Sequence, residues 1–362
     1  MLSIRIEKAA VPVAGKDIAA GTGRMPWVDY ARALAIMLVV YRHTMVGLDR
    51  SGLAVPSFLY NIQEFLFNVR MPVFFVLSGI FLGRSVTHRG QGYMIWKKAA
   101  NLLYPYLVWT FIFITIQILL SGYTNATRTT HDYWYILTDP RELDHMWYLV
   151  SLFTTSVLLI LVAPVLVKRP VLHLLLATGF HFVHPFVVKY SLLFYTSYYY
   201  IFLCIGVQAS SYIRELDKRD SRWLWKLLLL SLPFFIAGQL FWMNNIADNY
   251  KPLQDWYLLP FLVIILVACV VYYCVSRLLY NAGILRWMNT LGRASLYIYI
   301  LHLLVISSFR MACLKILHIN NVYVILGGSL LLGIIIPVLV YRLSKRWTFI
   351  HRLFSLDKQK GE

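Results

Sequence analysis

The sequence contains few charged residues and no cysteine framework. Asp, Glu, Lys and Arg make up 14% of its 362 residues, against about 25% in a typical soluble domain. The four cysteines include no CxxC pair and stand in or beside apolar stretches, so neither a disulfide scaffold nor a zinc-binding cysteine site is indicated. The sequence also shows no internal repeat and no low-complexity tract. The low fraction of charged residues argues against a soluble protein.

Long apolar stretches dominate instead, and hydrophobic residues make up 59% of the chain. A helix that crosses the ~30 Å hydrocarbon core needs roughly 20 mostly apolar residues. These stretches do not alternate as the strands of a membrane barrel would. We therefore predict an all-α, polytopic membrane helix bundle of about ten transmembrane helices. The predicted spans are residues 31–48, 58–83, 99–120, 147–167, 171–188, 192–212, 224–243, 256–276, 294–312 and 322–341.

Lysine and arginine are distributed unevenly between the segments that join these spans. With a cytoplasmic N-terminus, 24 of the 34 Lys and Arg residues fall on the cytoplasmic side, 7 on the outer side and 3 within spans. Positive charge is enriched in cytoplasmic loops, so both termini are predicted to be cytoplasmic. Residues 1–30 then form a cytoplasmic segment without a cleavable signal peptide, residues 31–341 the transmembrane domain, and residues 342–362 a basic tail.

The net charge of +18 has a membrane explanation. Most of the basic residues would face anionic lipid of the inner leaflet. No basic soluble domain is present, so nucleic-acid binding is not expected.

The first span carries Arg32 and His43, which are ionisable and costly at membrane depth. The two residues are 11 apart, or three helical turns plus about 20°, so they share one helix face about 16 Å apart along the axis. Asp29 could pair with Arg32 from one turn earlier. We predict that Arg32 lies at the cytoplasmic mouth and His43 deeper in the same cavity. Alternatively, Arg32 reaches the interface and His43 is a packing residue.

The second span carries Glu64 at a depth similar to that of His43. A carboxylate there could orient the imidazole of a catalytic base. It could instead form a structural ion pair with Arg42 or Arg70. Pro72 is expected to kink this helix, and Gly79 to permit close helix packing.

Other histidines are weaker candidates. His302 lies about eight residues from the inner end of its span, and His145 stands beside Trp147 at the outer face. His181 and His184 are more typical of packing residues. No group has the spacing of metal ligands, so we expect no metal.

A basic cytoplasmic loop, residues 84–98, contains Lys97 and Lys98. Such a loop could hold the phosphates of a nucleotide-containing donor. The same residues could also reflect membrane topology alone.

Five short motifs occur in order along the chain. They are Arg32 and His43 with ten residues between them, residues 70–79, residues 104–106, residues 146–149, and Gly292 with Ser295 and His302. Together they resemble the acyltransferase type 3 family of bacterial membrane acyltransferases, over nearly the whole chain. One difference is Asn101, where the family often has an arginine; Lys97 and Lys98, one turn earlier, could take its place.

The resemblance implies a multi-pass enzyme of the bacterial inner membrane. It would move an acetyl group from cytoplasmic acetyl-CoA to a hydroxyl of a cell-surface or exported glycan or of a lipid-linked sugar. His43 would be the base or, less favoured, carry the acyl group, Glu64 would orient it, and Arg32 would bind the donor. Substrate contacts are expected from Asp29, Arg42, Arg70, Lys97, Lys98, Trp147, Ser295 and His302.

Two other hypotheses fit a chain with buried charges. A transporter or flippase of a lipid-linked sugar could use them as a translocation path, although the paired halves of many transporters are not evident. A structural or sensory membrane protein would leave them without a role. The sequence identifies neither the acceptor nor the acyl chain.

Overall fold

The computed structural model describes residues 25–86, 89–121, 128–245 and 258–357. Within these ranges the regular structure is helical throughout, with no strand, and ten segments are long and apolar enough to span a membrane. The predicted all-α bundle is confirmed, and the chain is a multi-pass membrane protein. Most of the predicted N-terminal segment, residues 1–30, and the end of the tail lie outside the described residues.

Six of the ten spans are single helices. They are α1 (Trp27–Arg50), α7 (Trp147–Leu166), α9 (Ser191–Leu216), α10 (Ser221–Asn245), α11 (Leu258–Asn281) and α14 (Val322–Ser344).

The other four spans join two or three helical pieces. They are α2 (Ser57–Phe65) with α3 (Arg70–Val86); α4 (Gln91–Lys98) with a π-helix (Ala99–Leu103) and α5 (Tyr104–Leu119); α8 (Pro170–Val183) with a 3₁₀ turn (His184–Val187); and α13 (Ser295–Met311) with a π-helix (Ala312–Ile316). The third span therefore begins at Gln91, eight residues before the predicted start.

Short helices fill the connections. On one side lie the 3₁₀ turns Thr130–Trp134 and Pro140–Glu142 with α6 (Tyr135–Thr138) between them. The other two are α12 (Trp287–Arg293) and α15 (Thr348–Arg352).

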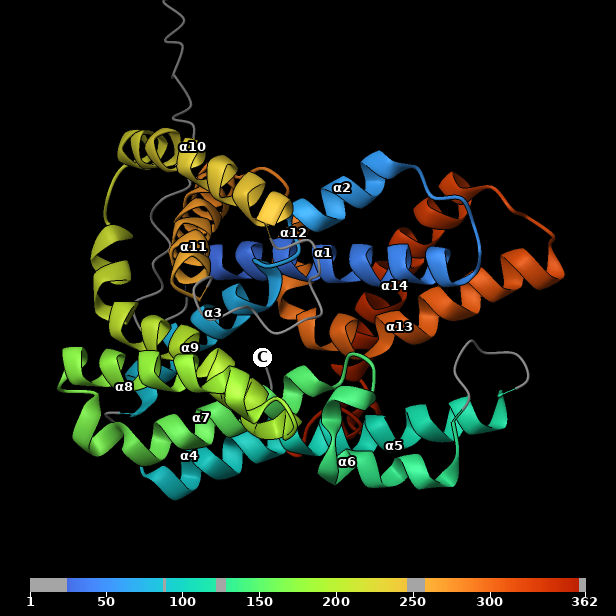
Figure 1. Cartoon of the computed structure of the whole chain (residues 1–362), viewed down its shortest axis with the longest axis horizontal. Helices are drawn as coiled ribbons and strands as arrows, with labels where there is room; N and C mark the ends of the chain where they lie inside the picture. The colour runs from blue at the N-terminus through green and yellow to red at the C-terminus, as the bar shows by residue number, and fades with distance from the viewer. Residues whose placement is uncertain (1–24, 87–88, 122–127, 246–257, 358–362) are drawn as a thin grey trace, which may run out of the picture.

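Several of the membrane helices, among them α1, α5 and α13, run roughly along one direction, and α11 crosses that direction (Figure 1). The turns at residues 51–56 and 317–321 meet at one end of the bundle, on the right in the picture, and the turn at residues 167–169 lies at the opposite end. We call the first end the outer end, following the predicted topology. The cytoplasmic placement of the termini itself stays a prediction.

The first helix is the central element of the bundle. It packs against α3, α11, α12, α13 and α14, and most of its residues are buried. Gly292 of α12 brings this short helix against the Asp29 backbone, because a Cβ at that glycine would overlap the Asp29 carbonyl. An ionisable residue on α1 therefore faces protein on several sides rather than lipid.

The helices α3 and α9 approach each other closely. A Cβ at Gly79 would overlap the carbonyl of Leu203, and a Cβ at Gly206 would overlap that of Val76. Small residues let membrane helices approach closely, so the packing role predicted for Gly79 is confirmed. The pair forms one wall of the site.

The second span does not contain the predicted kink at Pro72. It is interrupted instead at residues 66–69, between α2 and α3. Pro72 then falls in the first turn of α3, where the missing N–H costs little because first-turn N–H groups lack helical partners. The interruption turns the Phe67 carbonyl toward the Arg70 side chain, whose Nε donates to it at 3.1 Å.

A cavity at the outer half of the bundle

A cavity of about 940 Å³ occupies the outer half of the bundle. His43 lines it, and its wall continues to residues at the outer helix ends, such as Ser51, Leu120 and Lys315. The side chain of His43 is only partly buried, because one side of the ring borders this space. The predicted histidine therefore faces a protein-lined cavity rather than lipid.

Two further imidazoles surround His43. Its ring centroid lies 5.1 Å from that of His302 and 6.0 Å from that of His145, and the latter two are 5.0 Å apart. The three come from α1, from α13 and from the residue two before α7. Sequence reasoning had placed His145 only at the outer face, and its position beside the motif at residues 146–149 was the available signal.

The hydrogen bonds of the two flanking histidines assign their tautomers. His302 Nδ1 lies 2.9 and 2.8 Å from the carbonyl oxygens of Ile298 and Tyr299, so it carries the proton and donates. His145 Nε2 likewise donates to the Ile300 carbonyl at 3.2 Å. The remaining nitrogens, Nε2 of His302 and Nδ1 of His145, are buried and have no hydrogen-bond partner among the described residues. Each of these two nitrogens carries a lone pair that can accept a hydrogen bond.

His145 stays neutral near pH 7. It is 3% exposed, and burial lowers its pKa from 6.5 to about 4, since removal from water disfavours the charged ring. A neutral His145 does not repel the arginines that share the cavity wall.

Two arginines lie beside the histidine cluster. Arg42 and Arg70 are 9% and 7% exposed, and their guanidinium carbons lie 4.6 and 4.8 Å from the centre of the Phe67 ring. Arg70 is also fixed by its Nη1, which donates to the Leu38 carbonyl at 3.3 Å. Both guanidinium groups line the cavity, so two fixed cations border the space next to His43.

Glu64 belongs to the environment of Arg42. The Arg42 guanidinium donates to the side-chain oxygen of Gln63, and the Gln63 amide donates to Glu64. No contact joins Glu64 to His43 in the part of the chain that the structure describes, and the histidines at 145 and 302 occupy the positions around the ring. The geometry thus resembles the structural alternative for Glu64, with Gln63 inserted between the charges.

Arg32 does not line this cavity. Its guanidinium lies 5.2 Å from the centre of the Phe81 ring, within electrostatic range of Lys98 and Tyr148. The expectation that Arg32 and His43 open into one cavity is therefore wrong for this conformation. The two residues do lie at different depths along α1, as predicted.

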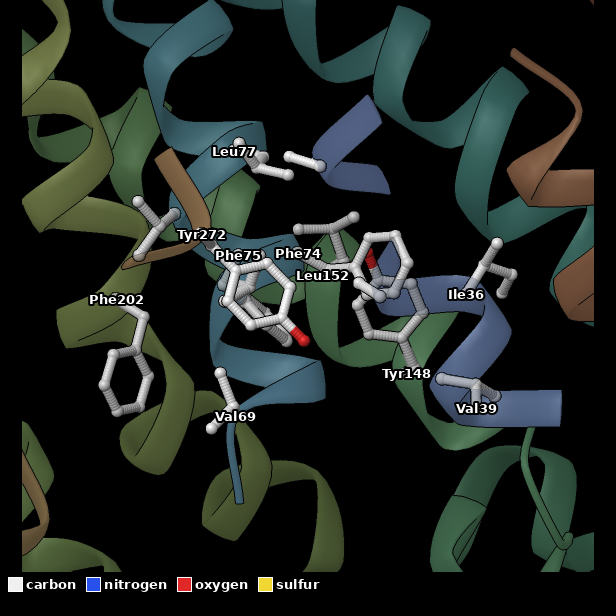
Figure 2. Close-up of a cluster of buried hydrophobic side chains, with 14 of the residues drawn as sticks. Ile36, Val39, Val69, Phe74, Phe75, Leu77, Tyr148, Leu152, Phe202 and Tyr272 are labelled. Atoms are coloured by element: carbon white, nitrogen blue, oxygen red, sulfur yellow. The ribbon is translucent and has the colours of Figure 1, made fainter. Parts of the chain in front are cut away.

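Aromatic side chains fill the space between Arg32 and the histidine cluster around His43. Tyr148 packs against Phe74, with ring centroids 5.8 Å apart, and against Tyr299 at 5.1 Å. Figure 2 shows Phe74 and Tyr148 next to each other, beside Ile36 and Val39 of α1. Ile36 and Val39 lie between Arg32 and His43 in sequence, so this aromatic layer separates the arginine from the cavity.

The C-terminal segment contacts the basic loop, residues 84–98, that was expected to bind the donor. Lys97 lies 3.5 Å from Asp357, and the Asn101 amide donates to the same carboxylate at 3.3 Å. The Ser355 hydroxyl donates to Asn101 at 2.7 Å. Asn101, the residue that departs from the family pattern, therefore holds the chain's own C-terminal segment. Lys98 lies instead within electrostatic range of Arg32.

The remaining candidates lie in different places. Asp29 is buried and lies 3.7 Å from Arg293. Trp147 lines the cavity and stacks on Tyr195, with centroids 4.2 Å apart. Ser295 is the first residue of α13, away from the cavity lining. No group of three or more metal-ligating side chains occurs within the described ranges.

His181 and His184 show the contacts of packing residues. Their rings lie 5.0 Å apart, and His181 Nδ1 donates to the Tyr198 carbonyl at 2.9 Å. His184 also borders the cavity.

Comparison with known proteins agrees with the resemblance noted from the motifs. A family model described as "Acyltransferase domain" matches residues 25–342, nearly the whole chain. No curated protein and no solved structure matches it. The matched region contains the histidine cluster, both arginine groups and the aromatic layer. The chain belongs to the acyltransferase type 3 family and is a membrane acyltransferase.

Proposed function

We propose that the chain transfers an acetyl group from acetyl-CoA to a hydroxyl of a cell-surface or exported glycan, in the inner membrane of a bacterium. The observation that carries the proposal is the position of His43, on the wall of a large cavity and beside two buried arginines. The family match favours an acyl-transfer enzyme over the transporter considered from the sequence.

In the proposed reaction, His43 accepts the proton of the acceptor hydroxyl as that oxygen attacks the thioester carbonyl. Imidazole suits this task because its unperturbed pKa lies near neutrality. The tetrahedral intermediate carries a negative oxygen, which Arg70 or Arg42 stabilises. The carbon–sulfur bond then breaks, and the thiolate of CoA takes the proton from the His43 imidazolium.

His302 replaces Glu64 as the proposed positioning residue. Its Nδ1 proton is committed to two backbone carbonyls, which leaves Nε2 as an acceptor in the cluster. An N–H of His43 directed at this lone pair would present the other nitrogen of His43 to the acceptor. This role rests on the 5.1 Å ring separation.

The donor is proposed to enter from the cytoplasmic end. Arg32 and Lys98 form a cationic pair there, suited to the phosphates of CoA. The acyl-bearing arm must then pass the layer formed by Tyr148 and Phe74 to reach His43, so those rings have to move during the reaction. The acceptor enters through the cavity from the outer end.

The test is acyl transfer by purified protein with labelled acetyl-CoA. His43→Ala should lower the rate of thioester cleavage by about 100- to 10,000-fold, the usual contribution of general base catalysis. His131→Ala is the matched control, since His131 lies exposed in the outer loop. Elution volume and melting temperature would show that both variants fold.

Full activity of folded His43→Ala would remove this histidine from the mechanism. Mass analysis of surface glycan from cells with and without the protein would then test the acceptor class. Glycan that lacks the acyl group only in cells without active protein supports the proposal.

A further inference from the structure

A second pair of arginines lines the cavity farther out. Arg50 is the last residue of α1 and Arg310 lies in the last turn of α13, and both border the cavity. Arg50 follows His43 by seven residues, or two turns to within about 20°, so both lie on one face of α1 about 10 Å apart along the axis. A single bound molecule could therefore contact both.

Gly47 makes the position of Arg310 possible. A Cβ at residue 47 would overlap Nη1 of Arg310, so the guanidinium lies directly against the α1 backbone. Gly47 is one turn after His43 and also lines the cavity. The absence of a side chain at this position therefore brings a cation from α13 onto the wall that holds His43.

Arg310 has no counter-ion in the described part of the chain. The structure records neither an ion pair nor a hydrogen bond for its guanidinium within those ranges, and the neighbouring charge is another cation, Arg50. Like charges at a partly buried position repel each other. An anion placed beside the Arg310 guanidinium would therefore form an ion pair with it and reduce this repulsion.

Another part of the cavity wall is different. Arg128 lies there 3.9 Å from Asp132 and 3.6 Å from Asp144, so its charge is already balanced. Among the described residues that line the cavity, seven are Lys or Arg and two are Asp or Glu. The excess of positive charge is greatest on the side of α1 and α13.

We propose that the acceptor carries an oxyanion, a phosphate or a carboxylate, which Arg310 and Arg50 bind one to two helical turns along α1 from His43. This inference rests on the proposed function, because it assigns the acceptor to this cavity. Guanidinium groups bind phosphate and carboxylate through paired, charge-assisted hydrogen bonds. The neutral part of the acceptor then lies along α1, with its hydroxyl at His43.

Binding can be measured apart from catalysis, through the melting temperature of the full chain in non-ionic detergent. Two anionic probes represent the two sources of charge: farnesyl diphosphate for a lipid-linked phosphate and trigalacturonate for a carboxylated glycan. Farnesol and galactotriose are their neutral counterparts. We expect one anionic probe to raise the melting temperature and its neutral counterpart not to do so, with the effect decreasing at high salt.

Three variants locate the binding site. Arg310→Gln should weaken binding of the active probe by about tenfold or more, the effect of losing one charge-assisted contact. Gly47→Ala changes no charge but displaces the guanidinium, so it should weaken binding as well. Arg128→Gln removes a cavity arginine that is already paired, and binding should stay within about twofold.

Failure to bind either anionic probe, or equal binding by wild type and Arg310→Gln, would overturn the inference. So would acylation of a neutral glycan at a rate that Arg310→Gln leaves unchanged. In that last case the proposed function would stand, because it depends on His43. Conversely, loss of anion binding in Arg310→Gln together with full activity of His43→Ala would refute the mechanism and keep the binding site.

Discussion

The outer cavity and the inner group around Arg32 both contain arginines packed on phenylalanine rings, but they differ in access to open space. At the outer half, His43, Arg42 and Arg70 border open space. At the inner half, Arg32 lies against the Phe81 ring, near Lys98 and Tyr148. All three arginines pack on a phenylalanine ring by cation–π attraction, but Arg42 and Arg70 also border the cavity and can contact a bound molecule directly. Under the proposed function, the acceptor side is therefore open in this structure, whereas the donor side has to open.

The comparison predicts separate kinetic effects for the two regions. Substitutions at the outer cavity should change the chemical step, because the proposed mechanism places the developing charge beside these cations. Substitutions at the inner group should change donor binding. Variants that affect both equally would contradict the division.

After His43, the largest effect is expected at Arg70. Arg70→Gln should lower kcat for CoA release by about 100- to 1,000-fold, the range for loss of an oxyanion-stabilising donor, with little change in KM for acetyl-CoA. Arg70→Lys keeps a charge but not the bonds to Phe67 and Leu38, and should be intermediate. Steady-state kinetics on folded variants checks both, and an unchanged kcat in Arg70→Gln would exclude this arginine from the reaction.

A smaller effect is expected at Arg32. Arg32→Gln should raise KM for acetyl-CoA by about tenfold, as expected for one lost contact between a cation and a phosphate, with kcat nearly unchanged. The sharper measurement uses S-acetylpantetheine, a donor without phosphates. Wild type and Arg32→Gln should use that donor equally well. An equal defect with both donors would show that Arg32 supports the fold or the pantetheine arm rather than the phosphates.

The smallest effect is expected where the C-terminal segment contacts Lys97 of the basic loop. Lys97 and Asp357 are 36% and 43% exposed, and exposed ion pairs contribute about 0–1 kcal/mol. Lys97→Gln and Asp357→Asn should each change KM for acetyl-CoA by no more than about twofold. If Lys97→Gln changed KM for acetyl-CoA tenfold and Asp357→Asn did not, Lys97 would have to break its ion pair with Asp357 and bind the donor.

The site was only partly predictable because two kinds of information were needed. The spacing of Arg32 and His43 follows from helix geometry, so their depths on one face could be derived. The residues that surround Arg32 and His43 could not be derived in this way. His145 and His302 lie more than 100 residues from His43 in sequence. Helical periodicity describes residues within one helix and gives no information about contacts between residues so far apart. The assignment of Glu64 to His43 assumed a continuous second helix, and the interruption at residues 66–69 invalidates that assumption.

The sequence by itself determined the class, the number of spans and the family of this protein. Each follows from local information: the apolar length that a bilayer requires and short motifs in order. Only the tertiary structure decided that His43 faces a cavity with two other imidazoles, that Tyr148 and Phe74 separate it from Arg32, and that Asn101 holds the C-terminal segment. These features depend on which helices become neighbours, and that choice is made by packing details such as the contact of Gly79 with Gly206 rather than by hydrophobicity along the chain.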